Sequence, residues 1–117
     1  YSLRIQDNNN GGEGVARLVD LSGAGSATLS FRYRRQNLDN ANDYVAVYAS
    51  SNGLSGPWTE LPAPRIEGGG TDGSYIQFTR DLSGYLVADA AIRLLGSPNL
   101  GNTDRVFFDD VEISCTP

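Results

Sequence analysis

Two adjacent carboxylates, Asp109 and Asp110, interrupt an apolar segment near the end of the sequence, RVFFDDVEIS at positions 105–114. The surrounding Val, Phe and Ile residues favour a β-strand. Side chains of a strand alternate between the two faces of a sheet, so one carboxylate must share the side of Val111 and Ile113. The phase of the strand selects Asp109 as the inward residue. A carboxylate in that position needs backbone N–H donors or a cation.

Aromatic and polar side chains that share strand faces form a second group of candidates. Planar rings stack on sugar rings, while arginine and glutamine hydrogen-bond hydroxyl groups. If their strands neighbour each other in one sheet, these residues form a platform for a polysaccharide or a protein partner. An ordinary solvated sheet face is the alternative. The residues are Arg32, Arg34, Tyr44, Tyr48, Tyr75 and Gln77.

The composition restricts the chemistry further. The chain has no histidine and one cysteine, which makes zinc and iron poor candidates and removes the commonest general base. Its net charge of −5 disfavours nucleic acid as a partner, and no apolar run is long enough for membrane insertion. The glutamates are scattered, so a carboxylate pair for glycoside hydrolysis cannot be assigned and we expect no enzyme. Cys115 is either free or pairs with a segment outside this sequence.

Short alternating segments, separated by Gly, Asn, Asp, Ser and Pro, recur along the chain and indicate an all-β fold. About eight strands are expected, at 2–7, 14–21, 26–35, 43–51, 58–61, 74–82, 90–97 and 105–114. A short helical turn is possible near 86–90, and the Gly-rich segment 67–73 is expected to be a mobile surface loop. Trp58 fits a core-lining position better than a binding one. The 117 residues suffice for a single domain.

The order of these segments resembles a known group of extracellular modules. The motifs that carry the resemblance are L-x-F-x-Y at 29–33, W-x-x-L at 58–61 and DDV-x-I at 109–113. They resemble MAM-type domains and the carbohydrate-binding-module-like jelly-roll domains of secreted bacterial proteins. The resemblance implies an antiparallel jelly-roll β-sandwich with a role in adhesion or ligand binding. The internal cysteines of animal MAM domains are absent here, so their disulfides are not implied.

The resemblance also implies that the first and last strands lie side by side and antiparallel, which brings Asp7 close to Asp109 or Asp110. Converging carboxylates repel one another unless a cation bridges them, and Ca²⁺ prefers such oxygen ligands. Glu13 and Asp43, each at the end of an Asx- or Gly-rich loop, are further candidate ligands. We therefore expect a structural calcium ion. The alternative has no metal: Asp7 forms an Asx-turn and Asp109 accepts backbone N–H bonds.

Residues 1–117 are thus expected to form one module excised from a larger secreted protein, since the sequence begins with Tyr1 rather than Met. The expected function is non-catalytic and extracellular: binding of a polysaccharide, supported by calcium. The alternative is an adhesion, protein-interaction or spacer domain attached to a secreted protease or other hydrolase. Neighbouring domains of the parent protein are further expected partners.

Overall fold

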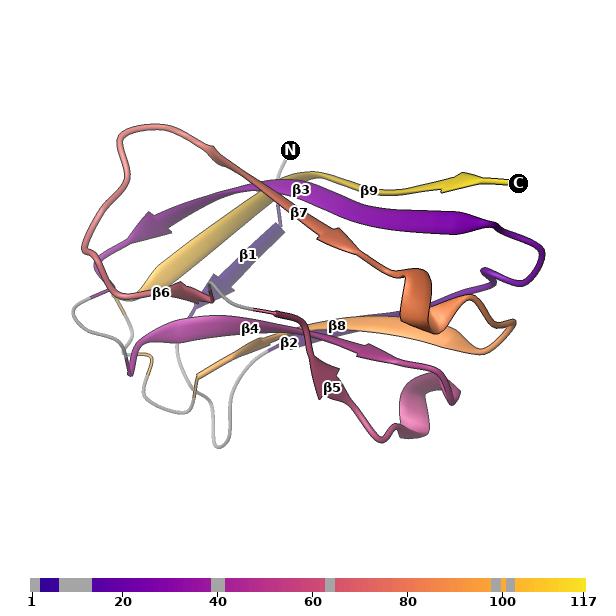
Figure 1. The fold of residues 1–117 in the computed structure, drawn as a ribbon. Helices are drawn as coiled ribbons and strands as arrows, with labels where there is room; N and C mark the ends of the chain where they lie inside the picture. The colour runs from indigo at the N-terminus through magenta and orange to yellow at the C-terminus, as the bar shows by residue number, and fades with distance from the viewer. Residues whose placement is uncertain (1–2, 7–13, 39–41, 63–64, 98–99, 101–102) are drawn as a thin grey trace.

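The computed structural model describes residues 3–6, 14–38, 42–62, 65–97, 100 and 103–117. Two antiparallel sheets pack face to face, which confirms the predicted β-sandwich (Figure 1). No helix among these residues is long and apolar enough to span a membrane. The described part of the chain contains two single 3₁₀ turns, η1 (Gly53–Ser55) and η2 (Ser83–Tyr85). A helical turn was considered possible near 86–90, and η2 ends immediately before this segment.

Sheet A has the strand order β1-β9-β3-β7. Its strands are β1 (Leu3–Gln6), β9 (Arg105–Thr116), β3 (Ser26–Gln36) and β7 (Ile76–Asp81). The first and last strands pair antiparallel, as the resemblance implied. Their register places Gln6 opposite Arg105 and Leu3 opposite Phe108. The end of β1 therefore lies at the beginning of β9, not beside the two carboxylates.

Sheet B has the order β2-β8-β4-β5. Its strands are β2 (Gly14–Val19), β8 (Ala90–Gly96), β4 (Tyr44–Ser50) and β5 (Thr59–Glu60). A further short strand, β6 (Ile66–Glu67), pairs with the beginning of β4. Its second residue, Glu67, begins the segment that was expected to be a mobile loop. Ile66 is buried just before that segment, and Arg35 of β3 donates hydrogen bonds to the carbonyls of Glu67 and Gly68 and to Asp72 within it.

The core between the sheets follows from alternation along each strand. On β3, Ala27, Leu29 and Phe31 are at most 1% exposed, while the residues between them face outward. The Phe31 ring stacks on Phe78 of β7 at a centroid distance of 4.5 Å and meets Phe108 of β9 edge-on at 5.3 Å. Such offset and edge-on arrangements suit the ring quadrupoles. These contacts hold three neighbouring strands of sheet A on one core.

A β-bulge in β9 corrects the prediction for Asp109. Ser30 pairs with Glu112 and Arg32 pairs with Asp109, so the single residue between them on β3 faces two residues on β9. Asp110, one of these two, has a φ of 54°. The extra residue shifts the alternation, so that Phe108 and Ile113 both contact the core. Neither carboxylate needs to turn inward: Asp109 is half-buried and Asp110 is exposed.

Candidate ligand-binding face

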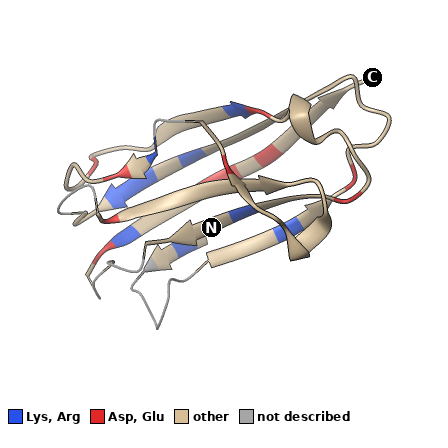
Figure 2. Ribbon diagram, turned by 60° about the horizontal axis from the view of Figure 1, so that its bottom comes forward, with Lys and Arg blue, Asp and Glu red and all other residues tan. Residues whose placement is uncertain are grey.

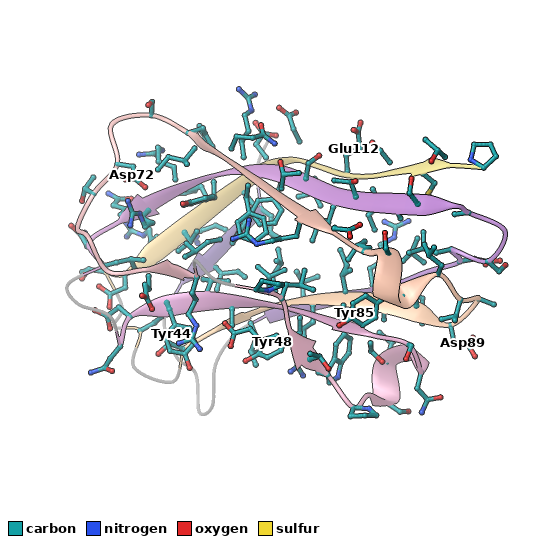
Figure 3. All side chains as sticks on the ribbon, viewed as in Figure 1. Tyr44, Tyr48, Asp72, Tyr85, Asp89 and Glu112 are labelled. Atoms are coloured by element: carbon teal, nitrogen blue, oxygen red, sulfur yellow. The ribbon has the colours of Figure 1, made fainter. Side chains whose placement is uncertain are left out.

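The six predicted ligand residues lie on two different sheets. Arg32 pairs across the strands with Gln77 in sheet A, and Tyr75 immediately precedes β7. Tyr44 and Tyr48 belong to β4 in sheet B. In Figure 3 these two tyrosines lie on the side of sheet B that faces away from sheet A. The prediction that these residues form a single platform was therefore wrong, because β4 does not neighbour β3 or β7.

The outer face of sheet A holds one of the resulting clusters. The Arg34 guanidinium carbon lies 4.8 Å from the ring centroid of Phe107 and 5.8 Å from that of Tyr75. Arg32 forms an ion pair with Asp110 at 2.6 Å and lies 6.0 Å from the Tyr75 ring. Both members of the ion pair are at least half exposed. Arginine and acidic positions occur on strands of both sheets, as Figure 2 shows.

The outer face of sheet B carries a second cluster. Strand β4 buries Val45, Val47 and Ala49 in the core and leaves Tyr44 and Tyr48 partly exposed on the other side. Four residues along a strand separate these tyrosines by about 13 Å. Ala46 lies between them and is fully buried. The strand repeat thus sets the spacing of the two rings, with the small Ala46 side chain between them.

The register of sheet B places Tyr48 opposite Arg93 of β8 and opposite Glu60 of β5. The Arg93 guanidinium carbon lies 4.6 Å from the Tyr48 ring centroid and 4.6 Å from that of Trp58. These distances fit cation–π contacts. The Nε atom of Arg93 is buried and has no hydrogen-bond partner among the described residues. One guanidinium therefore holds two aromatic rings while keeping an unused donor.

A second arginine continues the cluster. Arg65 donates two hydrogen bonds to Glu60, from Nε at 2.8 Å and from Nη2 at 2.9 Å. Its guanidinium carbon lies 4.1 Å from the Tyr44 ring centroid. The hydrogen bonds with Glu60 raise the pKa of Arg65 above its ordinary value. We call the six residues of this cluster the arginine–aromatic ladder: Tyr44, Arg65, Glu60, Tyr48, Arg93 and Trp58.

The ladder presents rings and hydrogen-bonding groups in fixed positions. Burial raises the pKa of Tyr48, and the negative charge of Glu60 acts in the same direction, while Arg93 and Arg65 oppose it. The Tyr48 hydroxyl is therefore protonated at neutral pH and can both donate and accept a hydrogen bond. Ring faces beside hydroxyl, guanidinium and carboxylate groups suit a ligand that is apolar on its flat faces and rich in hydroxyl groups at its edges.

Four ladder residues were not among the predicted ligand residues. Trp58 was expected to line the core, yet it is only partly buried and contacts Arg93 on the outer face. Arg65, Glu60 and Arg93 gave no local sequence signal. Their placement depends on the pairing of β4 with β5, β6 and β8, which residue patterns within one strand do not encode.

The predicted calcium ligands are only partly brought together. Asp7 and Glu13 lie outside the described residues. The Asp110 carboxylate accepts two hydrogen bonds from Arg32, and Asp109 accepts one from the Asp110 backbone N–H. Asp43 is buried at the beginning of β4. Among the residues that the structure describes, no three acidic or cysteine side chains converge as a metal site would require.

One buried carboxylate, Asp104, is not among the predicted site residues. Asp104 is 4% exposed and immediately precedes β9. The end of β1 and the end of β3 pair with the first residue of β9, so Asp104 lies at the end of the sandwich where β1 stops. The backbone N–H of Ser97 binds the carbonyl of Tyr44, which ties the end of β8 to the beginning of β4 beside Asp43.

Comparison with known proteins shows similarity of fold. No protein-family model matches the chain, and no curated protein matches its sequence. A cleaved adhesin domain of Lys-gingipain from Porphyromonas gingivalis superposes with a TM-score of 0.69 at 21% identity, covering 99% of this chain and 75% of that chain. A family 4 carbohydrate-binding module gives a TM-score of 0.61 at 18% identity, covering 98% and 70% of the two chains.

A family 29 carbohydrate-binding module is also similar, with a TM-score of 0.58 at 19% identity and coverage of 98% of this chain and 68% of that chain. These neighbours share the two-sheet sandwich with the present chain. They fit the expectation of a carbohydrate-binding-module-like fold. The resemblance to MAM-type domains finds no counterpart among these three structures, whose identities are all too low to carry more than the fold.

Proposed function

We propose that this protein is a non-catalytic binding module that recognises carbohydrate through the arginine–aromatic ladder. One observation carries the proposal: three aromatic rings on one outer sheet face are held by two arginine side chains at 4.1–4.6 Å. Rings already fixed in the free protein lose little conformational entropy when a ligand stacks on them. The similar structures include carbohydrate-binding modules, which supports the proposal at the level of the fold.

The partly exposed rings and their polar neighbours have complementary roles. Tyr44, Tyr48 and Trp58 would cover the flat faces of sugar rings. Glu60 and the Tyr48 hydroxyl would bind hydroxyl groups. The spacing of about 13 Å between Tyr44 and Tyr48 favours an extended oligosaccharide over a single sugar. A polysaccharide is therefore the proposed ligand class.

A second candidate function uses the outer face of sheet A. Arg32, Arg34, Tyr75 and Phe107 form a partly exposed cluster of arginine and aromatic residues, a composition common at protein interfaces. Gln77 lies beside Arg32 at its margin. The similarity to an adhesin domain supports this alternative, in which the module captures an extracellular protein. Extracellular localisation and attachment to a larger secreted protein belong to both proposals.

A structural calcium ion remains a proposal with a revised ligand set. The Arg32 ion pair makes Asp110 a poor ligand, and the register of β1 and β9 moves Asp109 away from the end of β1. We propose that Asp43, at the beginning of β4, is one ligand, together with Asp7 and Glu13, which lie outside the described residues. Calcium suits such mixed oxygen ligands from separate segments.

Affinity electrophoresis through gels that contain soluble polysaccharides tests the carbohydrate proposal. A panel of glucans, mannans, xylans and pectins should include at least one that retards the protein. Tyr48→Ala should abolish this retardation, whereas Tyr75→Ala on the opposite face should preserve it. Retardation lost with Tyr75→Ala alone would transfer the site to sheet A, and no retardation by any polysaccharide would contradict the proposal.

A further inference from the structure

One long side of the sandwich is open between the edge strands β1 and β2. Two adjoining hollows, of about 360 and 180 Å³, run along this side and share Arg17, Ile92 and Val111 as lining residues. Their walls come from β2 and β8 of sheet B and from β1 and β9 of sheet A. We call them together the side groove. It is separate from the arginine–aromatic ladder, which lies on the outer face of sheet B.

The side groove gathers exposed apolar side chains. Seven large hydrophobic residues are exposed in the described part of the chain, and four of them line the groove. These four are Leu3, Val15, Leu18 and Val111, with exposed fractions of 39%, 43%, 52% and 49%. Single exposed apolar residues are normal, but a contiguous group in a hollow marks a binding surface.

The groove also borders an unpaired strand edge. β9 has 12 residues, and β1 pairs with only Arg105–Phe108 of it. Beyond that point β9 keeps its pairing with β3 on one side and has no described strand on the other. Backbone N–H and C=O groups on such an edge are available to another strand. Because the bulge at Asp110 disturbs the ladder locally, the usable edge begins at Val111.

Charge indicates which strand could occupy this edge. The part of β9 beyond β1 carries Asp109, Asp110 and Glu112, and the whole chain has a net charge of −5. Two copies of this edge would repel each other, so self-association through β9 is disfavoured. Figure 3 shows Glu112 on the outer side of sheet A, where it would neighbour outward side chains of an added strand. A basic residue there would complement it.

We propose that the side groove docks an extended segment of a partner protein, which adds to sheet A as a strand along Val111–Thr116 of β9. The segment continues the antiparallel direction that β1 has begun. Its alternate apolar side chains enter the groove beside Val15, Leu18 and Val111, and the basic side chains between them face Glu112. Main-chain hydrogen bonds provide the affinity in this mode, and the side-chain pockets provide the specificity.

A designed peptide tests this interaction directly. The probe is a fluorescent seven-residue peptide that alternates Lys and Val, and the control peptide has the same residues with all Lys before all Val. Fluorescence anisotropy should show tighter binding of the alternating peptide. Amide hydrogen exchange should slow within Val111–Thr116 when it binds. Val111→Ser removes an apolar contact and should weaken binding about five- to tenfold. Val87→Ser is the matched control, since Val87 is similarly exposed at 38% but lies outside the groove.

Several results would overturn the proposal. Equal affinity for both peptides would reduce the interaction to charge attraction. Slower exchange elsewhere, or equal effects of Val111→Ser and Val87→Ser, would place the peptide on another surface. A dimer in sedimentation that already protects Val111–Thr116 would assign the groove to a second copy of the chain. Absence of binding at millimolar peptide would also reject it. None of these outcomes bears on polysaccharide retention, so the two proposals fail independently.

Discussion

Asp110 occupies the bulge of β9 with a positive φ of 54°, and its carboxylate meets Arg32 of β3 at 2.6 Å. The bulge allows two carboxylates to follow a buried phenylalanine without either entering the core. Exposed ion pairs contribute at most about 1 kcal/mol to stability, so the backbone conformation is the more important feature of this position. Aspartate tolerates the left-handed region better than most residues, and glycine tolerates it best.

Substitution of Asp110 should therefore follow backbone preference rather than charge. Asp110→Gly should keep the free energy of unfolding within about 1 kcal/mol of the parent, because relief of the positive φ offsets the lost ion pair. Asp110→Val should lower it by about 1–3 kcal/mol, since a branched residue is strained in this conformation. Urea unfolding measures the free energy of unfolding of both variants. A glycine variant that is as unstable as the valine variant would show that the carboxylate itself is essential.

The ion pair between Arg35 and Asp72 should make stability depend on pH. Both side chains are mostly buried, and the hydrogen bonds from Arg35 hold the pKa of Asp72 below its ordinary value of 3.8. A carboxyl whose pKa is lowered on folding contributes stability that is complete above the unfolded pKa. That contribution is lost as the pH falls from about 4 through the lower folded pKa. At pH 7, Asp72→Asn should lower the free energy of unfolding by about 2 kcal/mol.

Urea unfolding at pH 7 and pH 3 checks this dependence. The difference between the parent and Asp72→Asn should shrink at pH 3, where the parent has begun to lose the same contribution. Asp89→Asn, an exposed carboxylate before β8, serves as the control and should have little effect at either pH. A constant difference between the parent and Asp72→Asn would show that protonation of Asp72 has no role.

Calcium should stabilise the protein if the revised ligand set is correct. A ligand that binds only the folded state adds about 2.7 kcal/mol at a hundredfold excess over its dissociation constant, which raises the melting temperature by several degrees. Asp43→Asn should remove this response, whereas Asp110→Asn should retain it because Asp110 is paired with Arg32. Identical melting curves in EDTA and in excess Ca²⁺ would reject the calcium proposal.

The sequence was most informative where structure is local. Alternation on β3 predicted that Leu29 and Phe31 share one face, and both are buried. The sequence pattern did not predict β6, because Ile66 and Glu67 form a strand only through pairing with β4. Alternation also failed at Asp109, since the bulge beside it arises from the register between β9 and β3. Local patterns record which face a residue takes within an uninterrupted strand, and no more.

In the candidate site, too, strand patterns predicted which residues share a face but not which strands are neighbours. Tyr44 and Tyr48 were correctly placed on one face of their strand, because residues four apart in a strand point the same way. Their separation from Tyr75 could not be foreseen, since sheet membership is a property of the topology. The contacts of Arg93 with Tyr48 and Trp58 depend on the register of β4 and β8. Cross-strand neighbours therefore complete a site that strand patterns only begin.

Trp58 provides the most direct measurement of carbohydrate binding at the arginine–aromatic ladder. It is the single tryptophan of the chain, so intrinsic emission reports on this position alone. Titration with oligosaccharides from the polysaccharide that retards the protein should change Trp58 emission in a saturable manner. Tyr48→Ala should weaken that binding at least tenfold, and Tyr75→Ala should leave it unchanged. Binding at the ladder would be contradicted if a polysaccharide retards the protein but its oligosaccharides leave Trp58 emission unchanged. It would also be contradicted if Tyr48→Ala and the parent protein bind the oligosaccharides with equal affinity.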